Sequence, residues 1–301
     1  MALTAILAAL FGCGDKGGGP YQRRDDGWYF KDEPLNVPAG ETVTPLKGDF
    51  ATAGDRVFYR AAPIGGADAR TFEVLSDHHA KDRAAVYYAD THREGQEYFL
   101  VKHTRVRRIE GADPASFRYL DHDYARDASN AYFKGERFPV ADAATFEPLG
   151  YGHARDRVRG YYQQRPIEGS HGASFAALDD HYAKDAQHVF YSDVDLRSRP
   201  VAIRSVTLAG AHAASFTALD DGYAADSARA WFKGRPLKDA VPPLEVLAAG
   251  YAKTAARVYY FGDPVPDADA PSFKADAMTG APGTDASDAR GPFYEGKRVT
   301  R

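Results

Sequence analysis

Hydrophobic and polar positions recur with a fixed spacing along most of the chain. The clearest copy, Phe175–Tyr191, holds an apolar pair three residues apart, an Asp-rich turn, a Tyr-Ala-Lys-Asp segment, and a Val followed by two aromatic residues. The same spacing recurs at Phe72–Tyr88, Phe117–Phe133, Phe146–Tyr162, Phe216–Phe232 and Leu244–Tyr260. Two weaker copies, Val43–Tyr59 and Phe273–Tyr294, complete eight units, and the aromatic pair Tyr29-Phe30 precedes them. Recurrence at a fixed period indicates stacked supersecondary units.

Three columns of this repeat hardly vary. Leu recurs at positions 46, 75, 120, 149, 178, 219 and 247. Ala follows five residues later, at 51, 80, 125, 154, 183, 224 and 252. Asp recurs at 82, 127, 156, 185, 226 and 288. The Leu column predicts a repeated core layer, and the Ala column predicts places where a neighbour packs too closely for a larger side chain.

The local signals favour strands and hairpins. Val-aromatic-aromatic runs are typical of β-strands, and short Gly-containing links such as Lys134-Gly135, Lys233-Gly234 and Glu295-Gly296 predict tight hairpin turns after them. Pro at positions 34, 63, 166, 200, 236 and 264 suits strand edges or ends. With the Phe-x-x-Leu run as a third element, we expect three short strands in each unit.

The fold class that follows is all-β. We expect tandem repeats with a step of 29 residues between pairs such as Tyr59 and Tyr88, arranged as an open, elongated, solenoid-like array. A closed, eight-bladed propeller-like ring is the alternative, although a four-stranded blade usually takes about 40 residues. The repeat domain is predicted to span residues 27–299, with Tyr29-Phe30 in an N-terminal cap hairpin.

The N-terminal segment differs from the repeats. Residues 2–12 are uncharged and mainly apolar, and Leu10-Phe11-Gly12-Cys13 resembles a bacterial lipobox. We therefore predict a signal peptide over residues 1–12, lipidation of Cys13, and a flexible tether over residues 13–26. Phe11 is bulky for such a motif and no Lys or Arg precedes the apolar segment, so a cytosolic protein with an apolar N-terminal element is the alternative.

Composition narrows the chemistry. The 301 residues carry a net charge of −4, which gives no global attraction to nucleic acid, and the single Cys excludes a disulfide framework. His79 and His153 occupy a column that is Tyr elsewhere, so we interpret them as aromatic substitutions and expect no metal site and no cofactor. No Ser-His-Asp set in a strained turn and no phosphate-binding loop is apparent, so we expect no enzymatic activity.

Two units carry insertions directly after the aromatic pair, within residues 89–110 and 192–209. Both are rich in basic residues: Lys102, Arg105, Arg107 and Arg108 in the first, and Arg197, Arg199 and Arg204 in the second. Insertions in repeat proteins often bind a partner. The alternative interpretation is an extended hairpin with a solvated, charged side.

The repeat resembles the DKNYY family. Ala80-Lys81-Asp82 with Val86-Tyr87-Tyr88 carries the resemblance, as does Ala183-Lys184-Asp185 with Val189-Phe190-Tyr191. The resemblance covers roughly residues 27–299, although the Lys and Asn of the family's name are mostly Arg, Ala, Ser or Gln here. It implies a bacterial protein that is often attached to an exported lipoprotein signal, and it implies no catalytic residue.

Two columns are candidates for binding. The first aromatic residue of each pair points away from the Val side of its strand, and as an outward ladder these residues would stack sugars or hold an extended chain: Phe58, Tyr87, Tyr132, Tyr161, Phe190, Trp231, Tyr259 and Phe293. The alternative is packing against the next unit. The recurring Asp is interpreted as the cap of a turn, with a repeated calcium site as the alternative.

These observations predict a lipid-anchored protein of the bacterial cell envelope that acts as a non-catalytic binding or scaffold module. Its partner would be an envelope protein or glycan, with the membrane contacted through the lipid anchor. A structural spacer without a specific ligand and an unrecognised envelope hydrolase are the alternatives.

Overall fold

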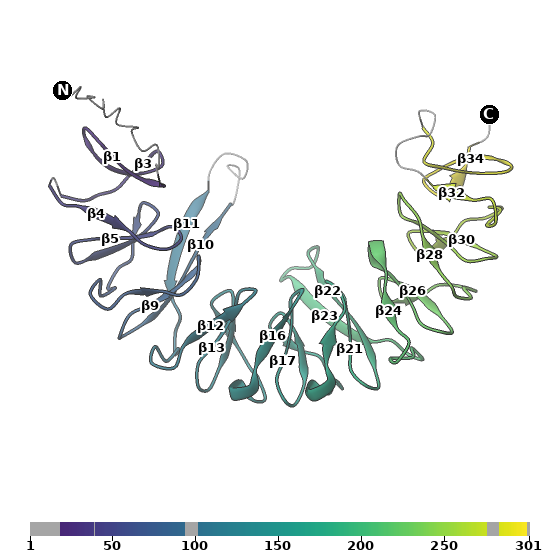
Figure 1. Cartoon of the computed structure of the whole chain (residues 1–301), viewed down its shortest axis with the longest axis horizontal. Helices are drawn as coiled ribbons and strands as arrows, with labels where there is room; N and C mark the ends of the chain where they lie inside the picture. Colours follow the sequence, from purple (N-terminus) through teal and green to yellow (C-terminus); the bar gives the residue numbers. More distant parts are fainter. Residues whose placement is uncertain (1–18, 39, 94–101, 276–282, 300–301) are drawn as a thin grey trace, which may run out of the picture. The chain divides into compact units, whose positions relative to one another are not determined.

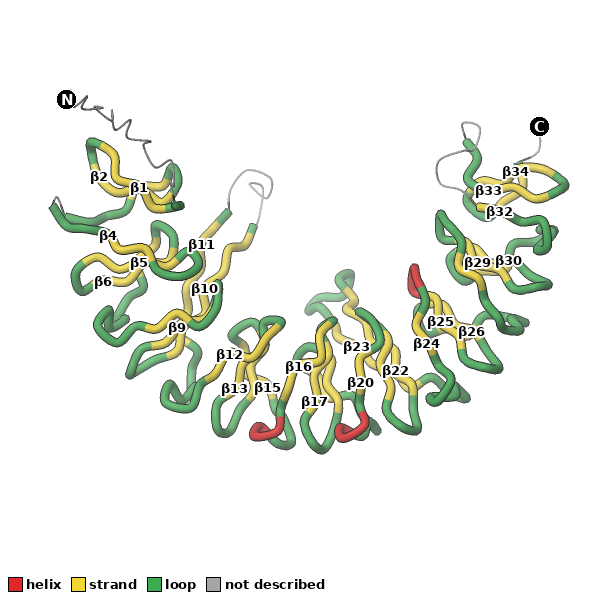
Figure 2. Tube along the Cα trace, viewed as in Figure 1, coloured by secondary structure: helices red, strands yellow, loops and turns green. Residues whose placement is uncertain are grey.

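Short antiparallel β-strands build almost all of the regular structure (Figures 1 and 2). The computed structural model describes residues 19–38, 40–93, 102–275 and 283–299. Within them the strands form nine separate sheets, each made of consecutive strands. The chain divides into two compact units, Met1–Phe117 and Arg118–Arg301. Among the described residues, no helix is both long enough and apolar enough to cross a membrane.

The first compact unit holds three sheets. The cap sheet consists of β1 (Tyr21–Arg24), β2 (Gly27–Phe30) and β3 (Glu33–Pro34). Repeat 1 consists of β4 (Val43–Pro45), β5 (Phe50–Ala53), β6 (Arg56–Tyr59) and β7 (Ala62–Pro63). Repeat 2 consists of β8 (Glu73–Val74), β9 (His79–Lys81), β10 (Val86–His92) and β11 (His103–Arg108).

The second compact unit holds six sheets of four strands. Repeat 3 has β12 (Arg118–Asp121), β13 (Tyr124–Arg126), β14 (Ala131–Phe133) and β15 (Glu136–Phe138). Repeat 4 has β16 (Glu147–Gly150), β17 (His153–Arg155), β18 (Gly160–Tyr162) and β19 (Arg165–Pro166). Repeat 5 has β20 (Ala176–Ala177), β21 (Tyr182–Lys184), β22 (Val189–Asp195) and β23 (Ala202–Thr207).

The remaining three repeats follow the same order. Repeat 6 has β24 (Thr217–Ala218), β25 (Tyr223–Ala225), β26 (Ala230–Phe232) and β27 (Arg235–Pro236). Repeat 7 has β28 (Glu245–Val246), β29 (Tyr251–Lys253), β30 (Val258–Tyr260) and β31 (Asp263–Pro264). Repeat 8 has β32 (Lys274–Ala275), β33 (Ala286–Asp288), β34 (Gly291–Tyr294) and β35 (Lys297–Arg298). Single 3₁₀ turns are η2 (Ala143–Thr145), η3 (Gly172–Ser174) and η4 (Asp220–Gly222).

The prediction of an all-β tandem repeat is therefore confirmed, and the expectation of three strands in each unit is wrong. Each repeat has four strands, and the unexpected one is the Tyr-Ala-Lys segment, for example β21. Ala and Lys have little intrinsic preference for strands, so the local sequence gave no signal. The segment becomes a strand because it is the inner partner of the aromatic strand, with Ala183 opposite Phe190 and Tyr182 opposite Tyr191.

The predicted Gly turns form as expected. In repeat 6, Lys233 and Gly234 both have positive φ angles, 47° and 74°, between β26 and β27. Two positive φ angles define the tight turn that matches the twist of a two-residue hairpin, and Gly adopts this conformation without steric cost. A Cβ atom at Gly234 would also lie only 2.7 Å from the ring of Tyr191 in the previous repeat. The turn is therefore fixed by both conformation and packing.

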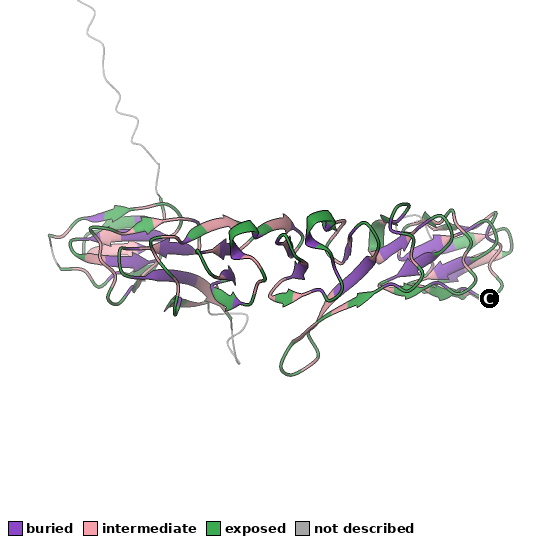
Figure 3. Cartoon of the chain, turned by 90° about the horizontal axis from the view of Figure 1, so that it is seen from below, coloured by how far each residue is buried: buried purple, intermediate pink, exposed green. Residues whose placement is uncertain are grey.

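The core lies between successive sheets, so both faces of an inner sheet are buried (Figure 3). Tyr182, Val189 and Tyr191 on one face of repeat 5 pack against Phe216 and Trp231 of repeat 6. The opposite face of repeat 5, which carries Ala183 and Phe190, packs against repeat 4. The Ala column is buried as predicted, whereas the Leu column is only half-buried at the margins of these clusters.

The flexible tether predicted over residues 13–26 is wrong at its C-terminal end, because the folded part already begins within it. Tyr21–Arg24 is strand β1, and Tyr21 is only 6% exposed. The Tyr21 hydroxyl donates to the carbonyl of Asp49 at 2.6 Å, and its ring lies 5.0 Å from that of Phe30. The packing and the hydrogen bond of Tyr21 therefore hold this polar stretch in the cap sheet. The predicted signal peptide and Cys13 lie outside the described residues.

Candidate functional site: two basic hairpins

The aromatic ladder is an internal feature of the repeats. Its eight members are at most 4% exposed: Phe58, Tyr87, Tyr132, Tyr161, Phe190, Trp231, Tyr259 and Phe293. Each lies opposite an Ala in its sheet. Trp231 packs on the anchor Phe216, with ring centroids 5.3 Å apart, whereas Phe58 and Tyr259 belong to clusters with Val43 and Leu244. These side chains have no free face for a ligand, so the prediction of an outward binding ladder is wrong and the packing alternative describes them.

The recurring Asp residues cap turns, as predicted. In repeat 4, Asp156 Oδ1 accepts the backbone N–H groups of Val158 and Arg159, both at 2.8 Å. Its Oδ2 accepts the Tyr161 hydroxyl at 2.6 Å and the N–H of Asp142 at 2.9 Å. Burial by itself raises the pKa of Asp156, but these hydrogen bonds outweigh it and hold the pKa below its ordinary value. Because N–H and O–H donors occupy its oxygens, the carboxylate acts as a cap.

A second column joins neighbouring repeats through tyrosine hydroxyls. The Tyr223 hydroxyl of repeat 6 donates to the carbonyl of Gly250 at 2.9 Å and accepts the N–H of Gly262 at 3.1 Å, both in repeat 7. His79 and His153 replace Tyr in this column and are fully buried. Burial lowers the pKa of each imidazole from 6.5 to about 4, so both are neutral near pH 7.

The two basic insertions form long hairpins. In repeat 2, β10 and β11 pair from Tyr87–Arg108 to His92–His103, and residues 94–101 lie outside the described part. In repeat 5, β22 and β23 pair from Phe190–Thr207 to Asp195–Ala202. Both insertions therefore form extended hairpins.

Both hairpins carry the same arrangement on one face. Asp90 lies opposite Arg105 and binds it at 2.7 Å. Asp193 lies opposite Arg204, with 3.4 Å between the charged atoms. Each Asp follows the second aromatic residue by two positions, so the aromatic ring and the ion pair share a face.

A histidine holds the base of each hairpin. His78 Nδ1 lies 2.8 Å from the carbonyl of Ala89, and His181 Nδ1 lies 3.0 Å from that of Ser192. The other repeats have Asp or Gly at this position, except repeat 8, which has Thr284. The imidazole therefore donates a hydrogen bond to a backbone carbonyl where the third strand continues into the long hairpin.

The predicted basic residues separate into two groups. Arg107 lies over the ring of Tyr88 at 5.1 Å, Arg108 donates to the carbonyl of Ala84 at 3.0 Å, and Arg199 donates to the carbonyl of Leu196 at 2.8 Å. Arg107, Arg108 and Arg199 are thus held by contacts within their own repeats, while Lys102 and Arg197 are exposed.

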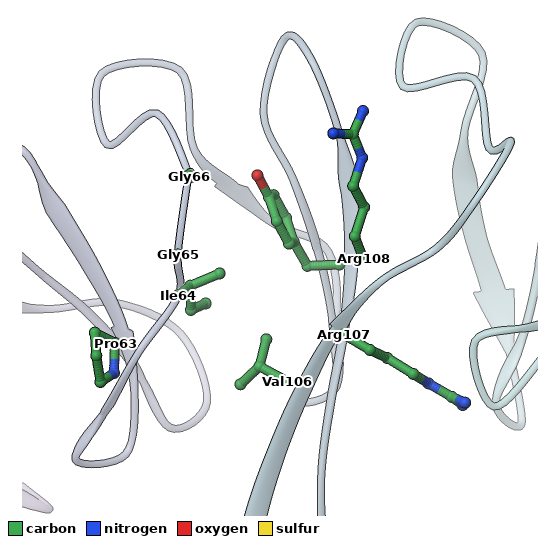
Figure 4. A pocket seen from close by; sticks show the side chains of 8 residues that line it. Pro63, Ile64, Gly65, Gly66, Val106, Arg107 and Arg108 are labelled. Atoms are coloured by element: carbon green, nitrogen blue, oxygen red, sulfur yellow. The ribbon is translucent and has the colours of Figure 1, made fainter.

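A hollow lies beside each hairpin. The first, of about 150 Å³, is formed by Tyr87, Val106 and Arg108 of repeat 2 with Ile64 and Gly66 of repeat 1. In Figure 4 the Arg107 side chain points away from this hollow, towards the other face of the strand. Arg107 and Arg108 are both among the residues that line the first hollow, together with the apolar side chains of Ile64 and Val106.

The second hollow, of about 290 Å³, lies between the repeat 5 hairpin and the turn of repeat 6. Tyr191 and Val206 form its apolar part, and it is lined by three basic residues, Arg204, Lys233 and Arg235, against one acidic residue, Asp193. Its charge is complementary to an anionic group. Lys233 and Arg235 were not predicted, because their turn looks like any other in the repeat.

Residues 50–165 and 91–197 match the model of the DKNYY family. The chain belongs to the DKNYY family. No curated protein and no solved structure matches the chain. In this DKNYY protein the columns that carry the family resemblance are structural: the Asp caps a turn, and the two aromatic residues pack on opposite faces of the sheet.

The DKNYY repeats also differ in how their sheet edges end. The last strand of the sheet ends in Pro in the cap sheet and in repeats 1, 4, 6 and 7, at positions 34, 63, 166, 236 and 264. Each Pro precedes a residue whose N–H bonds to the neighbouring strand, as Leu237 does to Ala230, so the Pro occupies a position whose N–H would point outward. The matching residues of the hairpins are Arg108 and Thr207, and β11 and β23 are six residues long and contain no Pro.

One side-chain cluster in the described part of the DKNYY protein has metal-binding composition. It consists of His171, Asp185 and His188 in repeat 5, whose ligand atoms all lie within 4.8 Å of one another. The sequence pattern did not point to it, because the two His residues are far apart and belong to different columns.

Proposed function

We propose that this DKNYY protein is a non-catalytic binding or scaffold module of the bacterial cell envelope. Its binding sites would be the two long hairpins, and its partner would be a protein that adds an extended, acidic segment to the edge of β23 or β11. The observation that carries this proposal is the contrast between Pro-ended edges in five sheets and the long, Pro-free edges of the hairpins.

Unpaired sheet edges attract other strands, and proteins commonly block them with Pro or keep them short. In β23, the Leu208 N–H bonds to the Val189 carbonyl, so the alternating ladder leaves the N–H and C=O groups of Ile203, Ser205 and Thr207 facing outward. An added strand would pair with these groups. A long edge without Pro is therefore open to a partner strand.

The charges near the edge favour an acidic segment. Arg204, Lys233 and Arg235 line the hollow beside the hairpin, and the apolar side chains of Leu196 and Val206 are 70% and 51% exposed. A partner strand with alternating acidic and apolar residues would meet both features. The net charge of the whole chain is −4, so the basic character is local to this region.

The envelope location in this proposal is supported by the sequence around Cys13. The only Cys of the chain directly follows an apolar segment and precedes a Gly-rich stretch. Intact-mass measurement of protein extracted from its native membrane, beside Cys13→Ala, tests this. A lipid mass increment on a chain beginning at Cys13 supports the anchor, and an unprocessed chain in both samples contradicts it.

The edge-strand proposal is tested by giving the hairpin the residue that other repeats use. Thr207→Pro should preserve the fold, because the matching Pro236 is native in repeat 6 and no ladder hydrogen bond is lost. A photo-reactive residue at Ser205 should cross-link a partner in native envelopes, and Thr207→Pro should abolish the cross-link.

Arg137→Pro is the matched control, because Arg137 occupies the corresponding position in the three-residue edge strand of repeat 3. It should leave the cross-link unchanged. An equal cross-link in Thr207→Pro would disprove strand addition, and the absence of any cross-linked partner would favour a structural spacer.

A further inference from the structure

A compact cluster of three potential metal ligands lies where a link meets the Asp-capped turn of repeat 5. His171 precedes η3, Asp185 follows β21, and His188 directly precedes β22. His171 Nδ1 lies 3.3 Å from Asp185 Oδ2, and His188 Nδ1 lies 3.6 Å from Asp185 Oδ1. The imidazole rings are nearly parallel, at 12°, with centroids 6.1 Å apart. Both Nδ1 atoms thus approach one carboxylate.

This arrangement is a departure from the repeat. The residue opposite the Asp on the link is itself Asp at positions 68, 113 and 142, but His at 171. The residue directly before the third strand is Ala85, Asn130 or Arg159 in repeats 2, 3 and 4, but His188 here. In repeats 2, 3 and 4 a Tyr hydroxyl donates to the Asp, whereas Phe190 supplies none in repeat 5. Three substitutions therefore converge on one carboxylate.

The geometry suits a tetrahedral ion. Zinc–ligand distances of about 2.0–2.2 Å at tetrahedral angles separate neighbouring ligand atoms by roughly 3.3–3.5 Å. The distance from His171 Nδ1 to Asp185 Oδ2, 3.3 Å, already agrees with this separation. His188 Nδ1 is a buried atom without a hydrogen-bond partner. A lone pair on that nitrogen is available for a metal.

The surroundings favour a charged, accessible site. The side chain of Asp185 is fully buried, and its oxygens accept the backbone N–H groups of His171, Gln187 and His188, which fix its position. The His171 side chain is 62% exposed and the His188 side chain 41%, so an ion can enter from solvent and retain water as a further ligand. A fixed carboxylate with two imidazoles is a donor set that zinc accepts.

We propose that His171, Asp185 and His188 form a binding site for one divalent transition-metal ion, with Zn²⁺ as the best-matched ion. The ion would tie the link before η3 to the turn that starts β22. It would thereby stabilise the base of the repeat 5 hairpin. This proposal is independent of the partner proposed for the hairpin edge.

The test is titration of the untagged full chain with Zn²⁺, followed by calorimetry. His188→Ala and His171→Ala should each weaken binding by at least about tenfold, since loss even of outer-shell partners costs about 10- to 100-fold. Both side chains are partly exposed and neither supports the core, so the variants should fold.

The chain offers a matched control in the next repeat. His212 contributes its N–H to Asp226 at 2.7 Å as His171 does to Asp185, but Arg229 stands in the place of His188. His212→Ala should therefore leave Zn²⁺ binding unchanged. Absence of Zn²⁺ binding by the native chain, or an equal loss in His212→Ala, would overturn the assignment. A rise in Tm with Zn²⁺ that disappears in His188→Ala would support it independently.

Discussion

At the scale of single residues, the repeats depend on polar groups that are buried with their partners. The Asp cap, for example Asp156, joins its own turn, the preceding link and a tyrosine hydroxyl through hydrogen bonds. Such fully occupied groups are stabilising only as a set, because a buried polar atom that loses its partner costs about 1–3 kcal/mol. His79 and His153 are also buried, and burial keeps both imidazoles in the neutral form.

The buried histidines predict a loss of stability in acid. Burial lowers the pKa of His153 from 6.5 to about 4, so between these values the unfolded chain binds a proton that the folded chain does not. The free energy of unfolding should therefore fall as the pH is lowered through this window, by up to about 3 kcal/mol for each fully buried His. His79 should behave in the same way.

Urea unfolding at several pH values from 7 to about 4 measures this effect. The His153→Phe variant should flatten the pH dependence, because Phe50 already occupies the same column in repeat 1. An exposed His gives the control, so His212→Ala should keep the native slope. Identical slopes in native protein and in His153→Phe would contradict the assignment.

At the scale of the element, each repeat is completed by its neighbour. The anchor Phe216 lies between Tyr182 of the previous repeat and Trp231 of its own, with ring centroids 5.5 Å and 5.3 Å away. The turn glycine Gly234 lies against Tyr191, and Gly234 donates its N–H to the Tyr182 hydroxyl at 3.1 Å. The stability of a repeat therefore resides largely in its interfaces, as in other repeat proteins.

The tyrosine hydroxyls predict a measurable interface energy. Tyr223→Phe removes the acceptor of the Gly262 N–H and the donor to the Gly250 carbonyl, and it leaves packing intact. We expect a loss of about 1–3 kcal/mol in the free energy of unfolding, measured with urea. Tyr29→Phe should change stability by less than about 0.5 kcal/mol, because the Tyr29 hydroxyl bonds only to the exposed Asp26. Equal effects of the two substitutions would refute a role for the hydroxyl.

The sequence predicts those features of the fold that depend on the local requirements of single residues. Gly turns, Pro edges, the Ala column and the Asp cap were predictable, because each reflects a backbone or packing requirement of its own residue. The Tyr-Ala-Lys strand was not, since its strand state comes from the aromatic strand beside it. The alternation along Val189, Phe190 and Tyr191 places Phe190 on the face opposite to Val189 and Tyr191. Alternation alone does not show that a neighbouring sheet covers the face that carries Phe190. His171 and His188 meet only through tertiary structure.

At the scale of the whole molecule, the two terminal sheets differ from the inner ones. The outer face of the cap sheet carries Gln22, Arg24 and Tyr29, with Arg24 stacked on Tyr29 at 4.3 Å. The last sheet has Asp285 where inner repeats have Tyr, and Tyr294 is 47% exposed. Polar outer faces are required of terminal repeats, because an uncovered apolar face promotes association. Among the described strands, the sheet of repeat 8 consists of its own four, β32–β35.

Removal of the last repeat should expose an apolar face that promotes association. Truncation after residue 266 uncovers Tyr251 and Val258, which pack against Phe273 and Phe293 in the full chain. We expect aggregation, measured by light scattering, and binding of a hydrophobic dye. The same truncation with Tyr251→Asp, which copies Asp285, should be more soluble. A truncated chain as soluble and stable as the full one would show that the terminal face is dispensable.

The inner interfaces resemble one another, and this similarity determines where repeats can be added or removed. Within residues 118–301, repeats 6 and 7 present matching columns: Tyr223 and Tyr251 on one face, Trp231 and Tyr259 on the other. A gene segment duplicated between them would encode a repeat whose faces already fit both neighbours, whereas duplication beyond the polar end would not. Growth and shrinkage by unequal recombination should therefore fall inside the array and spare its ends, and the hairpins would keep their own flanking repeats.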